Sequence, residues 1–170
     1  MAVFRRSACF ILAGLVAAWL FQPLVAHADP AFARFLPLFV DLDGWQGNKA
    51  DGASLEMPGN SMTTAKRDYR HGSSQLHASV IMGPAAAGAL APTKAGMNVE
   101  TSEGHMITTK VNDFTITKSY NNAEKSGAFL IALGDSALLT VSYNGMNEDD
   151  ALALARKLDW KAIQAATLQK

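Results

Sequence analysis

Residues 128–143 read AFLIALGDSALLTVSY, and this stretch decides the fold. Gly134 and Asp135 form a turn signal between two apolar runs, which predicts a β-hairpin. Both runs are apolar at consecutive positions instead of alternate ones. A strand that is apolar on both faces has to be covered on both faces, so this hairpin indicates a sheet packed between other elements.

One segment that can supply this cover follows Asp29 and Pro30, which together form a helix start. Apolar residues then recur at helical spacing as far as Val40, before Asp41 to Gly44 end the pattern. This apolar stripe consists of Phe32, Phe35, Leu36, Phe39 and Val40. We expect an amphipathic helix that packs on the sheet.

A second helix is predicted to begin at Asn147, with the acidic residues 148–150 in its first turn, where the helix dipole favours negative charge. Its apolar face consists of Ala151, Leu152, Leu154, Ala155 and Leu158. A further turn or two is expected from Asp159 through Trp160 and Ile163. The predicted fold class is therefore α+β, an antiparallel sheet of about six strands flanked by N-terminal and C-terminal helices.

Two further hairpins complete the predicted sheet. They pair residues 62–70 with 75–82, and residues 105–111 with 114–121. Gly72 and Ser73 are the central turn residues of the first hairpin, with positive φ required at Gly72, and Asn112 and Asp113 form the turn of the second. Residues 53–57 are an additional short strand candidate.

The register of the first hairpin places His77 opposite Asp68 on the solvent face. A carboxylate neighbour favours the imidazolium form, so one interpretation is a modest pH-sensitive pair. The other is an exposed cross-strand pair worth less than about 1 kcal/mol. His105 points towards Tyr120 and is interpreted as a strand-end histidine, not a base.

The first 28 residues have the pattern of a secretory signal. Arg5 and Arg6 form a positive region, residues 10–21 are apolar, and residues 26–28 read AHA, a small-x-small cleavage site. The apolar run is shorter than the roughly 20 residues that span a bilayer, which disfavours the alternative of a retained anchor. We expect a cleaved signal peptide at 1–28, a single α+β domain at 29–170, and a periplasmic or secreted protein without a stable membrane anchor.

Removal of the signal changes the composition of the chain. Cys9 is the only cysteine, so the remaining residues have no disulfide and no thiol chemistry. Arg5 and Arg6 leave with it, so 13 basic side chains face 15 acidic ones, which argues against nucleic acid or an anionic membrane as partner. No cofactor is expected.

The order of elements resembles the PsbP-like α/β/α sandwich family, whose members include photosystem II accessory proteins and many bacterial exported proteins of unknown role. The motifs that carry this resemblance are NEDD at 147–150, which opens a helix, GWQG at 44–47 and MPG at 57–59. The resemblance implies a non-enzymatic accessory or binding role. It carries over no catalytic residue.

Sulfur and imidazole side chains suggest one candidate site. Thioether and imidazole ligands favour Cu(I), and Met57 and Met62 lie five residues apart around a Pro-Gly turn. Met57, Met62 and His71 are therefore the candidate ligands of a soft metal. The alternative is that these methionines are ordinary apolar packing residues.

The apolar, alanine-rich segment from Gly83 to Gly96 suggests a second site. It is predicted to form either a lid over an apolar pocket or partner contact, or a short helical turn or connection without a function of its own. Leu90, Met97 and Trp45 are the candidate binding residues.

These observations favour an exported soluble accessory or binding protein without enzymatic activity, whose partner is a protein or a small apolar ligand in the periplasm. The alternative is a binder of soft metal or of a small apolar ligand, which would use the Met/His residues and the 83–96 segment. A hydrolytic enzyme is the third choice, because no nucleophile elbow, paired carboxylates or His-Glu-x-x-His helix is present.

Overall fold

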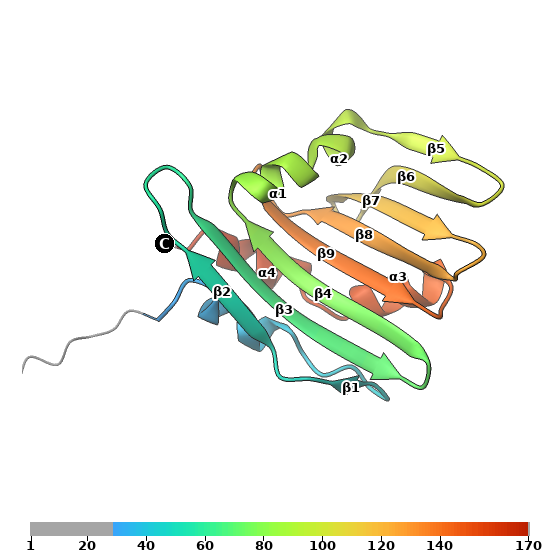
Figure 1. Cartoon of the computed structure of the whole chain (residues 1–170), viewed down its shortest axis with the longest axis horizontal. Helices are drawn as coiled ribbons and strands as arrows, with labels where there is room; N and C mark the ends of the chain where they lie inside the picture. Colours follow the sequence, from blue (N-terminus) through green and yellow to red (C-terminus); the bar gives the residue numbers. More distant parts are fainter. Residues whose placement is uncertain (1–28, 170) are drawn as a thin grey trace, which may run out of the picture.

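The computed structural model of the chain describes residues 29–169. Within them, all strands belong to one nine-stranded antiparallel sheet, and short helices pack on both of its faces (Figure 1). In chain order the elements are η2 (Ala33–Leu38), β1 (Gln46–Gly47), β2 (Asp51–Leu55), β3 (Met62–His71), β4 (Ser74–Met82), α1 (Pro84–Ala89), α2 (Ala91–Ala95), β5 (Asn98–Glu100), β6 (Gly104–Val111), β7 (Phe114–Asn121), β8 (Ser126–Ala132), β9 (Ala137–Asn144), α3 (Glu148–Ala155) and α4 (Trp160–Thr167). The α+β class is as predicted.

The three predicted hairpins are confirmed as β3–β4, β6–β7 and β8–β9. Gly72 has φ +58°, as its turn requires, and Asn112 and Asp113 both have positive φ at +49° and +69°. Two consecutive left-handed residues are typical of the type I′ turn, whose twist matches that of the flanking strands. The turn residues therefore fix the registers of these hairpins.

The sheet has more strands than the six predicted. The additional strands are β1, β2 and β5, each of five residues or fewer, and β2 overlaps the short strand candidate at 53–57. β1 and β2 both pair with β3, and β5 pairs with β6 at the opposite edge. Short edge strands of this kind contribute little apolar periodicity, which is why the sequence pattern underestimates their number.

Strand order places the doubly apolar hairpin at the centre of the sheet, because β9 lies between β4 and β8. Leu139 is fully buried in the main core, which η2, α3 and α4 cover. Its neighbour Leu138 points to the other face and packs with Ala86 and Leu90. Both faces of this hairpin are covered, as its sequence predicts.

The cover of the two faces differs from the predicted arrangement. η2 contacts α4, so the N-terminal and C-terminal helical segments lie on the same face of the sheet. Pro84–Ala89 and Ala91–Ala95, α1 and α2, cover the other face instead (Figure 1). The 83–96 segment thus forms two short helices that complete the core on this face. The sequence predicts a terminal helix as the cover of this face, but the internal segment supplies it instead.

The predicted N-terminal helix is also shorter than expected. It is a 3-10 helix of six residues, and Asp29 does not cap it, because its N-cap is Phe32. Pro37 lies inside the helix and has no N–H to donate to the carbonyl of Ala33 four residues earlier. An α-helix through this position would lose that bond. Of the predicted apolar stripe, Phe35 in the helix and Phe39 at its C-cap are buried, whereas Val40 is 43% exposed.

The predicted helix starts near the C-terminal end of the chain are confirmed. The Asn147 side chain accepts a hydrogen bond from the backbone N–H of Asp150, and Asp159 accepts one from Ala162. None of the helices within residues 29–169 is long and apolar enough to span a membrane. The predicted signal peptide at 1–28 lies outside the described residues.

Candidate functional site

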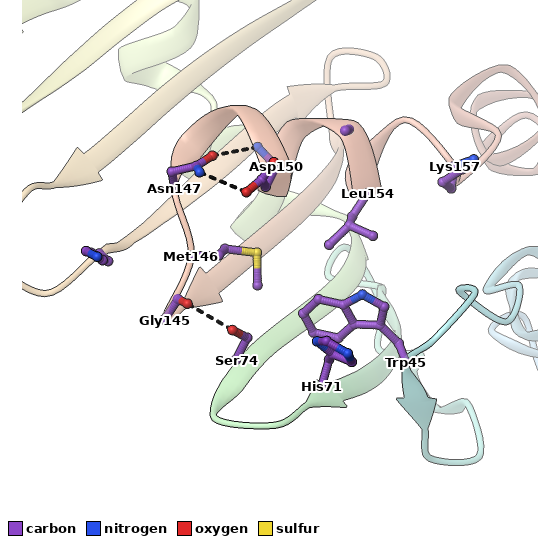
Figure 2. Close-up of a pocket in the computed structure, with 11 residues that line it drawn as sticks. Trp45, His71, Ser74, Gly145, Met146, Asn147, Asp150, Leu154 and Lys157 are labelled. Carbon is purple, nitrogen blue, oxygen red and sulfur yellow. Dashed lines mark hydrogen bonds between the residues drawn. The ribbon is translucent and has the colours of Figure 1, made fainter.

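A cleft of about 600 Å³ lies beside α3, at the end of the sheet where β3 turns into β4 (Figure 2). This volume falls in the range of small-molecule sites in proteins. Its lining residues are Trp45, His71, Ser74, Lys125, Gly145, Met146, Asn147, Asp150, Ala153, Leu154 and Lys157. The cleft therefore draws on four separate parts of the chain.

Two aromatic rings form one wall of the cleft. The ring centroids of Trp45 and His71 are 5.5 Å apart, with an angle of 38° between the planes. β1 brings them together, because Gln46 pairs with Arg70 and so sets Trp45 beside the last residue of β3. Gly44, at φ +79°, turns the chain immediately before Trp45. Figure 2 shows the two rings lying against each other.

Apolar side chains from the β9–α3 connection and from α3 lie across from these rings, as Figure 2 shows for Met146 and Leu154. Gly145 precedes Met146 at φ +75°, and its carbonyl accepts a hydrogen bond of 2.8 Å from the Ser74 hydroxyl. The Met146 N–H donates to the carbonyl of Lys125 at 3.2 Å. These bonds attach the β9–α3 connection to the β3–β4 turn and to the β7–β8 turn. The backbone around the cleft is therefore held in place without a ligand.

Charged side chains lie around the apolar centre. Asp150 accepts a hydrogen bond of 2.8 Å from the Asn147 amide, as part of the start of α3. Lys125 and Lys157 are exposed, and no ion pair involves either of them within the described residues. The lining thus carries two lysine ammonium groups and one carboxylate, that of Asp150.

The cleft contains a serine, a histidine and an aspartate, but they are not arranged as a nucleophile and its base. Among the bonds of residues 29–169, none joins Ser74, His71 and Asp150 to one another. Ser74 instead donates to Gly145, and Asp150 instead holds Asn147. A nucleophile and its base act through a mutual hydrogen bond, and these three side chains do not share one in the described part of the chain.

Of the six residues predicted to form sites, the structure brings Trp45 and His71 together in this cleft. Met62 and His71 are the first and last residues of β3, so they lie about 30 Å apart at 3.3 Å per residue. A single ion cannot bind both, and the predicted three-ligand set is wrong in this respect for geometric reasons. The pair of Met57, which is 48% exposed, and Met62 stays a prediction.

The predicted binding residues of the 83–96 segment do not reach the cleft. Leu90 is fully buried against Ala86 and Leu138, so its side chain completes the core. Met97 is 41% exposed and precedes β5, at the opposite edge of the sheet from Trp45. No group of three His, Cys, Asp or Glu side chains suited to a metal ion occurs in the part of the chain that the structure describes.

A polar cluster that the sequence analysis missed lies on the other side of α3. The Glu148 carboxylate bonds to Lys118 and, at 2.7 Å, to Nε2 of His105, and the Glu148 side chain is only 13% exposed. Burial alone raises the pKa of Glu148, but the hydrogen bonds and charges of Lys118 and His105 outweigh it and hold the pKa below its ordinary value. The register gave a signal for this cluster, because Lys118 pairs with Ile107 and so shares a face with His105.

The predicted His77–Asp68 pair is present on the opposite face of the sheet. His77 Nδ1 bonds to Asp68, and the two side chains are 40% and 48% exposed. The hydrogen bond from His77 is the main reason that the pKa of Asp68 lies below its ordinary value. Exposed pairs of this kind contribute little to stability, in agreement with the less specific of the two interpretations.

Comparison with known proteins gives no relative: no family model, no curated protein and no solved structure matches this chain. The resemblance to the PsbP-like family therefore stays a prediction.

Proposed function

We propose that this chain is an exported accessory or binding protein without enzymatic activity, and that it holds a small ligand in the cleft between Trp45 and α3. One observation carries the proposal: two aromatic rings face Met146 and Leu154 across a cleft of about 600 Å³. The lining also contains polar and charged side chains, and small-molecule sites use such groups to orient a ligand.

The shape of the apolar surface favours a flat ring as the core of the ligand. Aromatic rings bind other rings in offset or tilted arrangements, and each such contact contributes about 0.5–1.5 kcal/mol beyond the burial of apolar area. Methionine adapts to the edge of an aromatic ring, and Met146 is available for such a contact. Trp45 and Leu154 are partly exposed, so a ligand would remove apolar surface from water on both sides.

The absence of a bond between Ser74 and His71 supports a binding role over hydrolysis. Location in the periplasm is part of the proposal and is supported by the sequence pattern at 1–28. An accessory role agrees with the resemblance noted from the sequence.

The proposal is tested by nuclear magnetic resonance with ¹⁵N-labelled tryptophan. The full chain has three tryptophans, and Trp19→Phe leaves Trp45 in the cleft and Trp160 in the core. Trp160 is an internal control, because it is 4% exposed and its indole N–H donates to the carbonyl of Ala155 at 2.8 Å.

The probe is 1-naphthalenemethanol, a neutral bicyclic alcohol. About 0.3 kcal/mol per non-hydrogen atom predicts a dissociation constant in the roughly millimolar range for a probe of this size. We expect a saturable shift of the Trp45 signal and no shift of the Trp160 signal. A Trp45 signal that does not move, or that moves only together with Trp160, contradicts the proposal.

The hydrolytic alternative has its own test. Turnover of p-nitrophenyl acetate above the background rate, and its loss in Ser74→Ala, would establish an enzyme. We expect equal background rates for the wild-type chain and for this variant.

A further inference from the structure

We infer that the ligand of the cleft is an aromatic anion, a flat ring that carries a carboxylate or an equivalent acidic group. This inference rests on the proposed function and adds the charge of the ligand to it. Two lysines line the cleft and supply its positive charge.

Lys125 and Lys157 are both exposed, and both line the cleft. Arg67, Lys94 and Lys118 each form an ion pair with a carboxylate. No ion pair within residues 29–169 includes Lys125 or Lys157, although Asp150 lines the same cleft. The cleft therefore presents two ammonium groups whose charge no neighbouring carboxylate balances directly.

The positions of both lysines are fixed through the backbone. Lys125 has φ +47°, and its carbonyl accepts the hydrogen bond from the N–H of Met146, which also lines the cleft. Lys157 follows α3, and its N–H donates to the carbonyl of Leu154 at 2.9 Å. Each lysine is thus bonded through its backbone to an apolar residue that would contact the ring.

The one acidic group of the cleft is already engaged. Asp150 accepts the Asn147 amide at 2.8 Å, while the Asp150 N–H donates to the Asn147 side chain. It is part of the start of α3, which reduces its availability to a cationic ligand. An acidic group on the ligand would meet an excess of positive charge, whereas an amine would meet the two lysines.

Three probes of the same ring system separate the charge states: 1-naphthoate, 1-naphthalenemethanol and 1-naphthylmethylammonium. An exposed ion pair contributes about 0.2–1 kcal/mol, so two lysines predict roughly threefold to tenfold tighter binding of the anion than of the alcohol at low salt. The cation should bind more weakly than the alcohol. The advantage of the anion should shrink in about 0.5 M salt, where charges in water are screened within a few ångströms.

Matched variants assign this preference to the cleft. We expect Lys125→Asn and Lys157→Gln each to weaken the binding of 1-naphthoate by roughly twofold to threefold and to leave the alcohol unchanged. Asparagine suits the left-handed backbone at position 125. Lys161→Gln is the control, because Lys161 is on α4 and does not line this cleft.

The Trp45 indole signal of the Trp19→Phe chain reports each titration. Tighter binding of the anion that both cleft variants reduce supports the inference. Equal affinity for anion and alcohol, tighter binding of the cation, or an equal effect of Lys161→Gln overturns it while the proposed function stands. If none of the three probes moves the Trp45 signal, the inference and the proposed function both fall.

Discussion

The two sides of α3 show opposite uses of polar groups. On the side of β6 and β7, Glu148 meets Lys118 and His105, and the three side chains are between 13% and 26% exposed. On the other side, Lys125 and Lys157 line the cleft without an ion-pair partner among the described residues. The first arrangement is closed, and the second leaves room and charge for another molecule.

This difference separates stability from recognition. A buried carboxylate with two donors stabilises the contact between α3 and the sheet, because removal of one partner leaves the others without water or a counter-charge. Exposed lysines without ion pairs contribute little to folding. Changes on the closed side should therefore alter stability, and changes on the open side should alter binding.

The largest effect is expected from Glu148→Ala. It removes the acceptor of Lys118 and His105 and should lower the free energy of unfolding by about 2 kcal/mol. Urea unfolding followed by circular dichroism measures this loss. Asp149→Ala is the control, since Asp149 is exposed in the same first turn of α3, and it should cost less than about 1 kcal/mol. Equal losses would mean that only the helix dipole matters.

Acid should remove the same stabilisation. The pKa of Glu148 is lowered from 4.5 in the folded chain, so its contribution is complete above about that pH and is lost as the pH falls towards the lowered value. The wild-type chain should exceed Glu148→Gln in stability at pH 7, and the gap should narrow below pH 4.5. Urea midpoints at a series of pH values measure it. A gap that widens in acid contradicts the assignment.

Asn147 belongs to both sides of α3, because it caps the helix and lines the cleft. Asn147→Ala should lower the free energy of unfolding by about 1 kcal/mol and should also weaken the binding of 1-naphthalenemethanol. Asp159→Ala removes the equivalent cap of α4 and should cost about the same stability with no effect on binding. If both variants bind the probe equally, the Asn147 side chain has no role in binding the probe.

The smallest effect on stability is expected at His71. Because its side chain is exposed, His71→Ala should change the free energy of unfolding by less than about 0.5 kcal/mol. It should weaken the binding of 1-naphthalenemethanol by roughly threefold to tenfold, since one ring of the aromatic wall is lost. His77→Ala is the matched control on the opposite face of the sheet. Unchanged binding in His71→Ala would remove the imidazole from the site.

Local patterns were enough to predict the hairpins and the helix starts, because turn residues and caps act over a few residues. Gly72 and Asn112 set their turns, and Asn147 begins α3 as expected. The sequence does not predict which helices cover which face of the sheet, because residues 84–95 have only a weak apolar period. Pro37 also interrupts the apolar stripe around it and shortens the N-terminal helix.

The candidate site was predicted only in part. Trp45 and His71 lie 26 positions apart, and the two-residue strand β1 that brings them together has no detectable period. Glu148 looked like an ordinary acidic residue in the first turn of a helix. Its partners on β6 and β7 become visible only when the packing of α3 on the sheet is known.

Nuclear Overhauser contacts between 1-naphthoate and the chain would test the location of the ligand most directly. We expect the ring protons of the bound probe to show contacts with the Leu154 methyl groups, the Met146 ε-methyl group and the Trp45 indole. Contacts with Met97 and Val99 at the opposite edge of the sheet, and none with these three residues, would contradict the assignment of the cleft as the binding site.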